Sequence, residues 1–307
     1  MKFTVFQESR QGGRSNNEDR TAYSYTRDAL LLVIADGMGG HHHGEIASQI
    51  AVQTLVNSFQ REAKPLLPDP FLFLQRSIHH AHQAIIDYAT RKQLDESPRT
   101  TLVACVVQDG IAYWAHAGDS RLFLMRNGRV VAQTRDHSRI RLLIEEGMIS
   151  EAQAARHPDR NKIYSCLGGT TPPEIEYSRK TPLEHGDVIL LATDGLWGVT
   201  SGDLMAVALK GSNLLQAVPM LMAQAEIKGG PHGDNLSVVT IRWEEDPEDS
   251  ESSISTQTMA LNEVATQMEE FGRTPAYKGE LSDDEIEKAI EEIRAAIEKY
   301  NPRKQGQ

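Results

Sequence analysis

The residues of this sequence that could do chemistry are aspartates beside glycines at the ends of apolar segments: Asp36-Gly37, Gly118-Asp119, Asp194-Gly195 and Gly233-Asp234. One such pair is ordinary turn chemistry, but four of them, together with Glu18-Asp19, form a constellation. If their strands lie in adjacent sheets, the carboxylates can converge at one rim, where they repel one another and raise one another's pKa. One or two divalent cations would remove that repulsion. Because the ligands are all oxygens, Mg²⁺ or Mn²⁺ is expected rather than zinc.

Arg14 lies in the polar loop before Asp19 and is a candidate for holding a phosphate. Paired metal ions about 3.5–4 Å apart suit in-line attack of a metal-bound hydroxide on a phosphoryl group. The planar guanidinium group of Arg14 could hold the phosphate oxygens bidentately. Taken alone, a solvated loop arginine is the simpler interpretation. Three consecutive histidines, His41–His43, could suggest zinc, but they cannot all face one site from the start of a helix, so solvation or capping is expected for His42 and His43.

Several other functions are disfavoured by what the sequence lacks. It contains no Gly-x-x-x-x-Gly-Lys-Ser/Thr loop, no kinase signature and no Gly-x-Ser-x-Gly turn. Its two cysteines, Cys105 and Cys166, make a disulfide framework implausible and indicate a reducing compartment. There is no apolar segment of the signal-peptide type and no run near the ~20 apolar residues that span a bilayer. A cytoplasmic protein without a membrane partner is therefore expected.

The net charge of −11 is concentrated near the C-terminus. Residues 244–307 carry 17 acidic and 7 basic side chains, whereas residues 1–243 carry 26 and 25. A body that is nearly neutral shows no basic excess for binding nucleic acid. Residues 244–280 are acidic and partly serine-rich, which indicates a disordered linker. The body, residues 1–243, is therefore expected to form the one folded domain.

A helix is expected near the C-terminus, over residues 281–300, followed by a disordered end at 301–307. Ser282-Asp-Asp-Glu285 matches a capping box. The apolar residues after it alternate spacings of four and three and form one narrow stripe: Ile286, Ile290, Ile293, Ile297 and Tyr300. Such a stripe has to pack against the body, a partner or a second copy of itself.

The pattern of the body predicts an α+β fold with mainly antiparallel sheet. Strands are expected at 3–8, 21–26, 30–35, 100–107, 111–117, 121–126, 129–133, 187–192 and 236–243, and helices at 45–61, 71–92, 139–146, 150–156, 201–210 and 213–228. Asp109-Gly110 and Asn127-Gly128 tolerate positive φ and indicate two-residue hairpins. These two turns predict a meander of four antiparallel strands over residues 100–133.

Taken together, these motifs resemble the PP2C (PPM) family of metal-dependent protein serine/threonine phosphatases in its bacterial form. The resemblance runs from about Phe3 to Trp243. It rests on Arg14-Ser-Asn-Asn-Glu18-Asp19, Asp36-Gly-Met-Gly-Gly-His41, Ala117-Gly-Asp119-Ser-Arg121, Thr134-Arg-Asp-His-Ser138, Leu167-Gly-Gly, Ala192-Thr-Asp194-Gly-Leu-Trp and Gly233-Asp234-Asn-Leu-Ser-Val-Val. The family's fold implies a four-layer α/β/β/α sandwich, with two antiparallel sheets flanked by helix pairs and a dimetal cleft at one edge.

The resemblance also implies how two core ions, Mn²⁺ or Mg²⁺, would be held. Asp36 would bridge them, and the carbonyl group of Gly37 would join the second ion. Asp194 and Asp234 would complete the first ion. Asp119 would hold a third, weaker ion together with Asp194.

The remaining roles implied by the resemblance concern the second ion and the substrate. Asp19 would bind the second ion directly or through water, and Glu18 is its rival for that role. Arg14 would hold the substrate phosphate, and His41 would act as general acid or help to position the substrate. The segment between Asp136 and Gly169 would form a flap beside the cleft. Relatives often have Arg-Ala before Leu-Gly-Gly, where this chain has Ser165-Cys166, a departure that concerns specificity rather than metal binding.

The expected function is therefore hydrolysis of phosphoserine and phosphothreonine on protein substrates, in opposition to a bacterial serine/threonine kinase. One alternative is a pseudophosphatase that binds phosphoproteins as a scaffold, and another is a metal-dependent hydrolase of a different phosphoester. The presence of every expected metal aspartate favours an active enzyme. The absence of a nucleotide-binding motif weighs mildly against the third interpretation.

Overall fold

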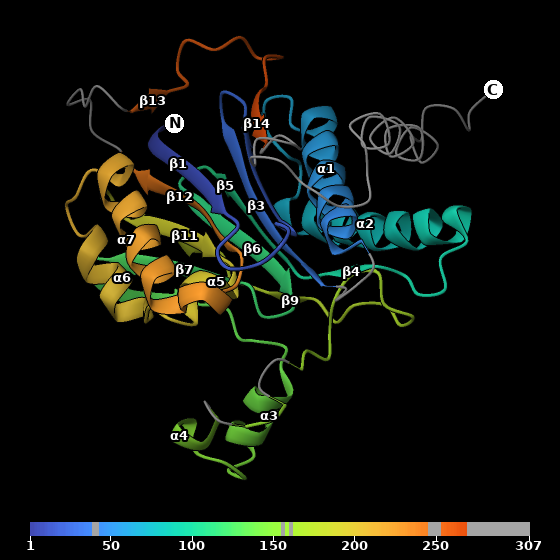
Figure 1. Cartoon of the computed structure of the whole chain (residues 1–307). Helices are drawn as coiled ribbons and strands as arrows, with labels where there is room; N and C mark the ends of the chain where they lie inside the picture. Colours follow the sequence, from blue (N-terminus) through green and yellow to red (C-terminus); the bar gives the residue numbers. More distant parts are fainter. Residues whose placement is uncertain (39–42, 155–156, 160–161, 245–252, 269–307) are drawn as a thin grey trace.

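The apolar segments of the sequence form two antiparallel β-sheets that pack face to face (Figure 1). The structure is a computed structural model that describes residues 1–38, 43–154, 157–159, 162–244 and 253–268. The six-stranded sheet has the order β13 (Ile254–Ser255), β1 (Lys2–Arg10), β12 (Leu236–Trp243), β11 (Val188–Ala192), β7 (Arg121–Arg126) and β8 (Arg129–Gln133). The eight-stranded sheet has the order β10 (Thr181–Pro182), β6 (Ile111–Ala117), β5 (Leu102–Gln108), β3 (Ala29–Met38), β2 (Asp19–Tyr25) and β14 (Ala265–Met268), with β4 (Arg99–Thr100) beside β3 and β9 (Glu176–Tyr177) beside β6.

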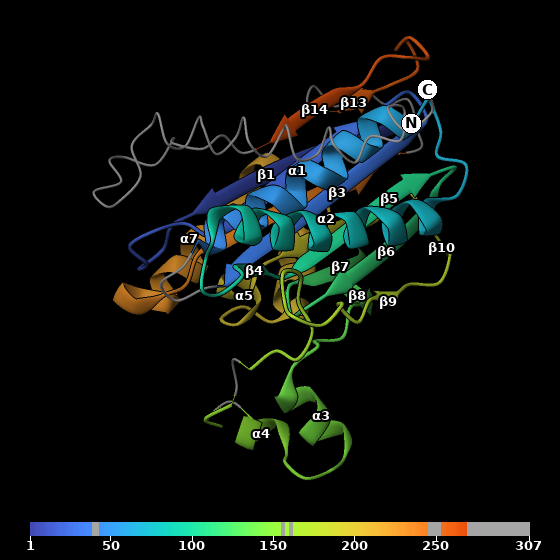
Figure 2. The same ribbon diagram turned by 90° about the vertical axis from the view of Figure 1, so that its right-hand side faces the viewer.

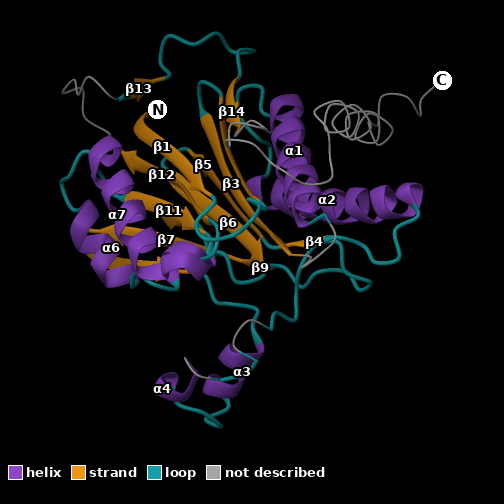
Figure 3. Ribbon diagram, viewed as in Figure 1, coloured by secondary structure: helices purple, strands orange, loops and turns teal. Residues whose placement is uncertain are grey.

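Each sheet carries a pair of helices on its outer face (Figure 3). The eight-stranded sheet is covered by α1 (Gly44–Glu62) and α2 (Pro70–Lys92), and the six-stranded sheet by α6 (Gly202–Leu209) and α7 (Leu214–Gly229). This arrangement confirms the expected α/β/β/α sandwich. Among the residues described, no helix has both the length and the apolar character needed to cross a membrane.

The alternation of β3 explains the layering. Its odd-numbered apolar residues, Leu31 and Val33 among them, pack against α1 and α2. Its even-numbered residues, Leu30, Leu32 and Ile34, pack against the opposite sheet. Successive side chains of a strand point to opposite faces, so a continuous apolar run is buried on both sides. The apolar run of β3 ends at Asp36, its first charged residue. The apolar layer between the sheets therefore ends there as well.

The predicted four-stranded meander over residues 100–133 is wrong. Both hairpins form, with positive φ at the two residues of each turn, but β5–β6 lies in one sheet and β7–β8 in the other. The chain crosses between the sheets at residues 118–120. Gly118 has φ +111°, and a Cβ atom there would lie 2.7 Å from the side chain of Thr101. Hairpin signals fix each pair of strands but not the connection between pairs.

The segment predicted as a flap projects away from the sandwich (Figure 2). It carries α3 (Arg139–Glu145) and α4 (Glu151–Ala154). Ser138 caps α3 by accepting a hydrogen bond from the Arg141 N–H group at 3.2 Å. The base of the flap is closed by a bridge between Ser138 and Ile163. The flap is thus joined to the core through a narrow stem.

The predicted disordered linker, residues 244–280, is wrong for residues 253–268. There β13 pairs with β1 of the six-stranded sheet, and β14 pairs with β2 of the eight-stranded sheet. These strands attach through backbone hydrogen bonds to sheet edges, and such pairing leaves little apolar pattern in the sequence. The rest of the linker beyond Glu244, the expected helix at 281–300 and the end at 301–307 lie outside the described residues.

Thr256 should anchor this extension. Its hydroxyl group is fully buried, donates to the Arg27 carbonyl group at 2.6 Å and accepts from the Met1 amino group at 2.9 Å. We expect Thr256→Val to lower the free energy of unfolding by about 1–3 kcal/mol, because it leaves these partners unsatisfied. Urea denaturation measures the change. The exposed Thr258→Val is the matched control, and equal stability of both variants would contradict the anchoring role.

Candidate metal centre

Acidic side chains from both sheets meet at one edge of the layer between them. Asp19 begins β2, and Asp36 lies near the end of β3. Asp194 begins the short helix α5 (Asp194–Trp197) just after β11, and Asp234 immediately precedes β12. Asp119 follows β6, where the chain crosses between the sheets. The other four carboxylates all raise the pKa of Asp36, so the structure brings together the five aspartates singled out in the sequence.

The strand register sets Asp19 directly opposite Asp36. Residues opposite one another on antiparallel strands share a face, and like charges there repel. The main chain of Asp36 is held firmly despite this repulsion. Its N–H group donates to the Thr101 hydroxyl at 3.0 Å, and its carbonyl group accepts from the Thr101 N–H at 2.9 Å and the Thr100 hydroxyl at 2.8 Å. The strand is therefore fixed at the point where the repulsion acts.

Glu18 occupies a different place from Asp19. The Glu18 carbonyl group accepts from the Gly37 N–H at 3.1 Å. Its carboxylate lies so close to Gly44, at the start of α1, that a Cβ atom there would sit 2.4 Å from Glu18 Oε2. Burial and the charge of Glu45 raise the pKa of Glu18 to about 7. Glu18 thus flanks Gly37, whereas Asp19 points into the layer between the sheets.

Thr193 ties Asp19 of one sheet to β12 of the other. Its hydroxyl group donates to Asp19 Oδ2 at 2.8 Å and accepts from the Ser237 N–H group at 3.0 Å. Thr193, Asp19 and Ser237 are all fully buried. A threonine next to Asp194 therefore orients a carboxylate that is distant in the sequence.

Asn235 fixes the loop that carries Arg14. Its side-chain amide donates to the carbonyl groups of Gln11 and Asn16, at 2.8 Å each, and its Oδ1 accepts from the Glu18 N–H at 2.9 Å. Arg14 Nη2 then lies 2.5 Å from Asp234 Oδ2. The Arg14 side chain is 56% exposed. A guanidinium group consequently stands at the open side of the carboxylate cluster.

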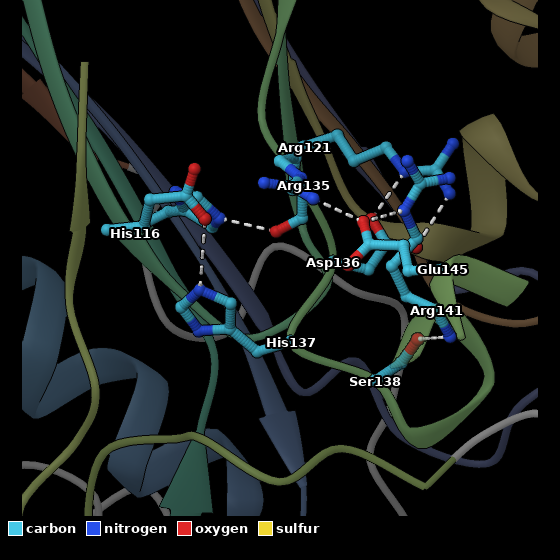
Figure 4. A network of polar contacts seen from close by, with 9 residues as sticks. His116, Arg121, Arg135, Asp136, His137, Ser138, Arg141 and Glu145 are labelled. Atoms are coloured by element: carbon cyan, nitrogen blue, oxygen red, sulfur yellow. Dashed lines mark hydrogen bonds and ion pairs between the residues drawn. The ribbon is translucent and has the colours of Figure 1, made fainter. Parts of the chain in front are cut away.

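The carboxylate group of Asp136 lies near that of Asp119. Arg121 holds Asp136 through two hydrogen bonds of 2.7 Å (Figure 4). The Arg121 guanidinium group in turn lies 3.5 Å from the ring centroid of Trp197 in α5, a favourable cation–π contact. These contacts fix the stem of the flap close to Asp119.

Burial raises the pKa values of the clustered aspartates, and their mutual repulsion adds to the effect. Desolvation is the largest cause for Asp19, Asp36 and Asp194, and neighbouring aspartates raise the pKa of each further. Burial, followed by the charge of Asp136, raises the pKa of Asp119 to about 6. Without a counter-charge, the cluster therefore retains protons that isolated carboxyl groups lose near pH 4.

The donor atoms of the cluster fit hard divalent cations. Within the described part of the chain, Asp19 Oδ1 and Asp194 Oδ1 are buried and make no hydrogen bond of normal geometry, although the Ser237 hydroxyl group is near enough to Asp19 to lower its pKa. Buried polar atoms are normally satisfied, so these two oxygens are oriented for a ligand that is not protein. The donors are all oxygens, which suits Mg²⁺ or Mn²⁺.

The residues that orient the ligands were not evident from the sequence, and one of the candidate site residues cannot be placed. Thr193 and Asn235 each adjoin a predicted ligand, and a hydroxyl or amide group beside such an aspartate was the available signal. Arg121 closes one of the motifs quoted from the sequence but was given no role there, and Thr101 stands far from Asp36, so no local pattern marks it. His41 lies outside the described residues.

Thr193→Val should weaken Mn²⁺ binding about 10- to 100-fold, because groups that orient metal ligands typically contribute that much. The substitution removes the donor to Asp19 and leaves the Ser237 N–H group unpaired. Isothermal titration measures the affinity. Thr200→Val is the matched control, since this buried hydroxyl group has no hydrogen-bond partner among the described residues. Equal Mn²⁺ affinity of the two variants would refute the role of Thr193.

Mn²⁺ should stabilise the protein more at about pH 7.5 than at about pH 5.5. Because the folded-state pKa values of Asp19, Asp36 and Asp194 are raised, the folded state binds more protons than the unfolded state. Stability from these groups is present at low pH and is lost as pH rises through the folded-state values. Thermal denaturation with and without Mn²⁺ measures the difference. A Mn²⁺-induced shift in Tm that is independent of pH would contradict this account.

Known proteins match both the sequence and the fold. The family model of protein phosphatase 2C matches residues 7–211. The serine/threonine phosphatase stp of Listeria innocua is 30% identical over 231 residues, which cover 74% of this chain and 90% of the relative. The structure of the S. agalactiae serine/threonine phosphatase has a TM-score of 0.71 at 28% identity and covers 79% of this chain and 100% of that chain. The catalytic domain of the phosphatase PstP, in complex with two manganese ions, has a TM-score of 0.66 at 30% identity. The match covers 78% of this chain and 98% of that chain. The resemblance is confirmed, and the chain belongs to the protein phosphatase 2C family.

Proposed function

We propose that this chain is a metal-dependent phosphatase that removes phosphate from phosphoserine and phosphothreonine in proteins. The observation that carries the proposal is the buried carboxylate cluster, in which Asp19 and Asp194 each keep one unpartnered oxygen, with Arg14 at its open side. Relatives and structural neighbours named as serine/threonine phosphatases support the same substrate class.

Two core Mn²⁺ or Mg²⁺ ions are proposed, with a third at Asp119. Asp36 would bridge the core ions, Asp194 and Asp234 would complete the first, and the Gly37 carbonyl group would join the second. The manganese complex of PstP supports a two-ion centre of this kind. The Coulomb interaction between Asp119 and Asp194 supports their sharing a third ion.

The structure favours Asp19 over Glu18 as the direct ligand of the second ion. Thr193 fixes one Asp19 oxygen and leaves the other, which is buried, without a partner among the described residues. Glu18 flanks Gly37 from outside the layer between the sheets. We therefore assign Glu18 a contact through water.

Arg14 is proposed to orient the phosphoryl group. Bound divalent ions supply Lewis acidity and activate water for in-line attack. Arg14 pairs with Asp234 in the structure. As a metal ligand, Asp234 would share its charge with the ion and would leave the guanidinium group available to phosphate oxygens. Its fork would hold them in a fixed orientation, which lowers the entropic part of the barrier. His41 remains the proposed general acid for the leaving serine or threonine oxygen.

We propose that the protein works in the cytoplasm beside a protein kinase. A serine/threonine kinase would supply the phosphoproteins, and the free thiols of Cys105 and Cys166 are compatible with a cytoplasmic location. Self-association or partner binding through residues 281–300 remains a proposal about residues outside the described range.

Hydrolysis of a phosphothreonine peptide with Mn²⁺ tests the proposal. Asp36→Asn should lower kcat/KM about 100-fold or more, since it changes a proposed metal ligand. Arg14→Lys should raise KM about tenfold, because hydrogen bonds to charged groups contribute about 1.5–3 kcal/mol and lysine lacks the planar fork. Asp95→Asn, which changes an exposed aspartate, is the matched control and should match the unmutated chain.

The same assay separates the alternatives. A pseudophosphatase would bind the phosphopeptide, yet its rate would equal that of Asp36→Asn. A hydrolase of another phosphoester would turn over p-nitrophenyl phosphate but show no preference for the phosphothreonine peptide. Either result would overturn the proposed function.

A further inference from the structure

A second cluster of metal-ligating side chains lies at the stem of the flap. His116 in β6 is directly opposite Glu176 in β9. His137, just before the cap of α3, approaches His116 from the flap (Figure 4). One ligand atom from each of the three residues lies within 4.8 Å of the others. The proposed phosphatase chemistry uses none of these residues.

The orientation of His116 resembles that of a metal ligand. Its Nε2 atom lies 2.6 Å from the Arg135 carbonyl oxygen. A carbonyl oxygen can only accept, so Nε2 carries the proton and Nδ1 presents its lone pair. His116 is 2% exposed, and Nδ1 is buried without a hydrogen-bond partner in the described part of the chain. Metal-binding histidines typically donate their other ring nitrogen to such an acceptor.

His137 and Glu176 complete the arrangement. His137 is also 2% exposed, and its ring lies 4.6 Å from that of His116. His137 Nε2 is 3.7 Å from Glu176 Oε2. Its Nδ1 atom lies 3.4 Å from the Gly118 N–H group, which is a long contact. Metal binding through Nε2 would move the ring proton from Nε2 to Nδ1 and would break this contact. The Glu176 side chain is 45% exposed and gives an ion access to the cluster.

Both imidazoles are neutral near neutral pH. Burial, more than any other cause, lowers the pKa of His116 and lowers that of His137 to about 4. Neutral imidazole is the ligating form, so His116 is ready to bind an ion and His137 needs only to move its ring proton from Nε2 to Nδ1. The neutral pair also leaves the Glu176 carboxylate facing uncharged rings rather than a protonated histidine.

We propose that His116 Nδ1, His137 Nε2 and a Glu176 carboxylate oxygen form a Zn²⁺ site, separate from the carboxylate centre. Two imidazoles and one carboxylate suit zinc, which accepts nitrogen and oxygen ligands in a tetrahedral arrangement with one position left for water. The all-oxygen centre suits Mg²⁺ or Mn²⁺ instead. Because His137 starts the flap and the other two ligands lie in the eight-stranded sheet, the ion would clamp the flap stem to the core.

Zn²⁺ titration of the full chain in saturating Mg²⁺ tests the site, with Mg²⁺ occupying the carboxylate centre. One Zn²⁺ per chain should bind, and amide hydrogen exchange in α3 should slow. Glu176→Gln should weaken Zn²⁺ binding about tenfold or more, and His116→Asn and His137→Gln should abolish it. Glu174→Gln removes the same charge two residues away and should leave Zn²⁺ affinity unchanged.

The double variant Asp36→Asn/Asp194→Asn should keep its Zn²⁺, because the proposed ligands are intact. If it loses Zn²⁺, or if Glu176→Gln and the two histidine variants all keep full uptake, the ion binds at the carboxylate centre and the proposal is wrong. Absence of any Zn²⁺ uptake would also overturn the proposal and would leave only a packed histidine pair beside a carboxylate. Should the histidine variants fail to fold, Glu176→Gln, at a partly exposed side chain, decides the question.

Discussion

Repulsion among buried carboxylates is the constraint on which the site depends. Asp19 and Asp36 stand opposite one another by strand register, and Asp194 joins them from the other sheet. Such a group of like charges is tolerated only when protons or cations neutralise it. The sandwich opposes the repulsion with fixed backbone contacts, such as those of Thr101 to Asp36, and with the buried hydroxyl group of Thr193. The energy that holds the aspartates together comes from the apolar layers on both sides of the sheets.

The flap stem connects two sites of different chemistry. Asp119 and His116 lie three residues apart near the end of β6, so one strand reaches both the carboxylate centre and the proposed zinc site. Arg121 fixes Asp136 through two hydrogen bonds. The residue after Asp136 is His137, one of the proposed zinc ligands. An ion held by the histidines would therefore set the position of the flap relative to Asp119. Different ligand atoms allow the two sites to select different metals in the same solution.

The sequence indicated the fold class and the five central aspartates because each of these leaves a local signal. Strand-end aspartates beside glycines are visible as short patterns, and the apolar run 30–35 predicted a strand. The sheet assignment of β7 and β8 was not predictable from hairpin turns, which carry no information about the crossing at Gly118. The strands at 253–268 were missed because edge pairing depends on backbone groups. His116, His137 and Glu176 meet only through the fold, and no spacing between them marks a site.

Divalent ions are expected to replace protons on the clustered aspartates. Calorimetric titration of Mn²⁺ in buffers of different ionisation enthalpy measures that exchange directly. With raised pKa values at Asp19, Asp36, Asp119 and Asp194, we predict release of protons on Mn²⁺ binding near pH 6 and a smaller release near pH 8.5. Mn²⁺ binding that releases no proton near pH 6 would contradict the account.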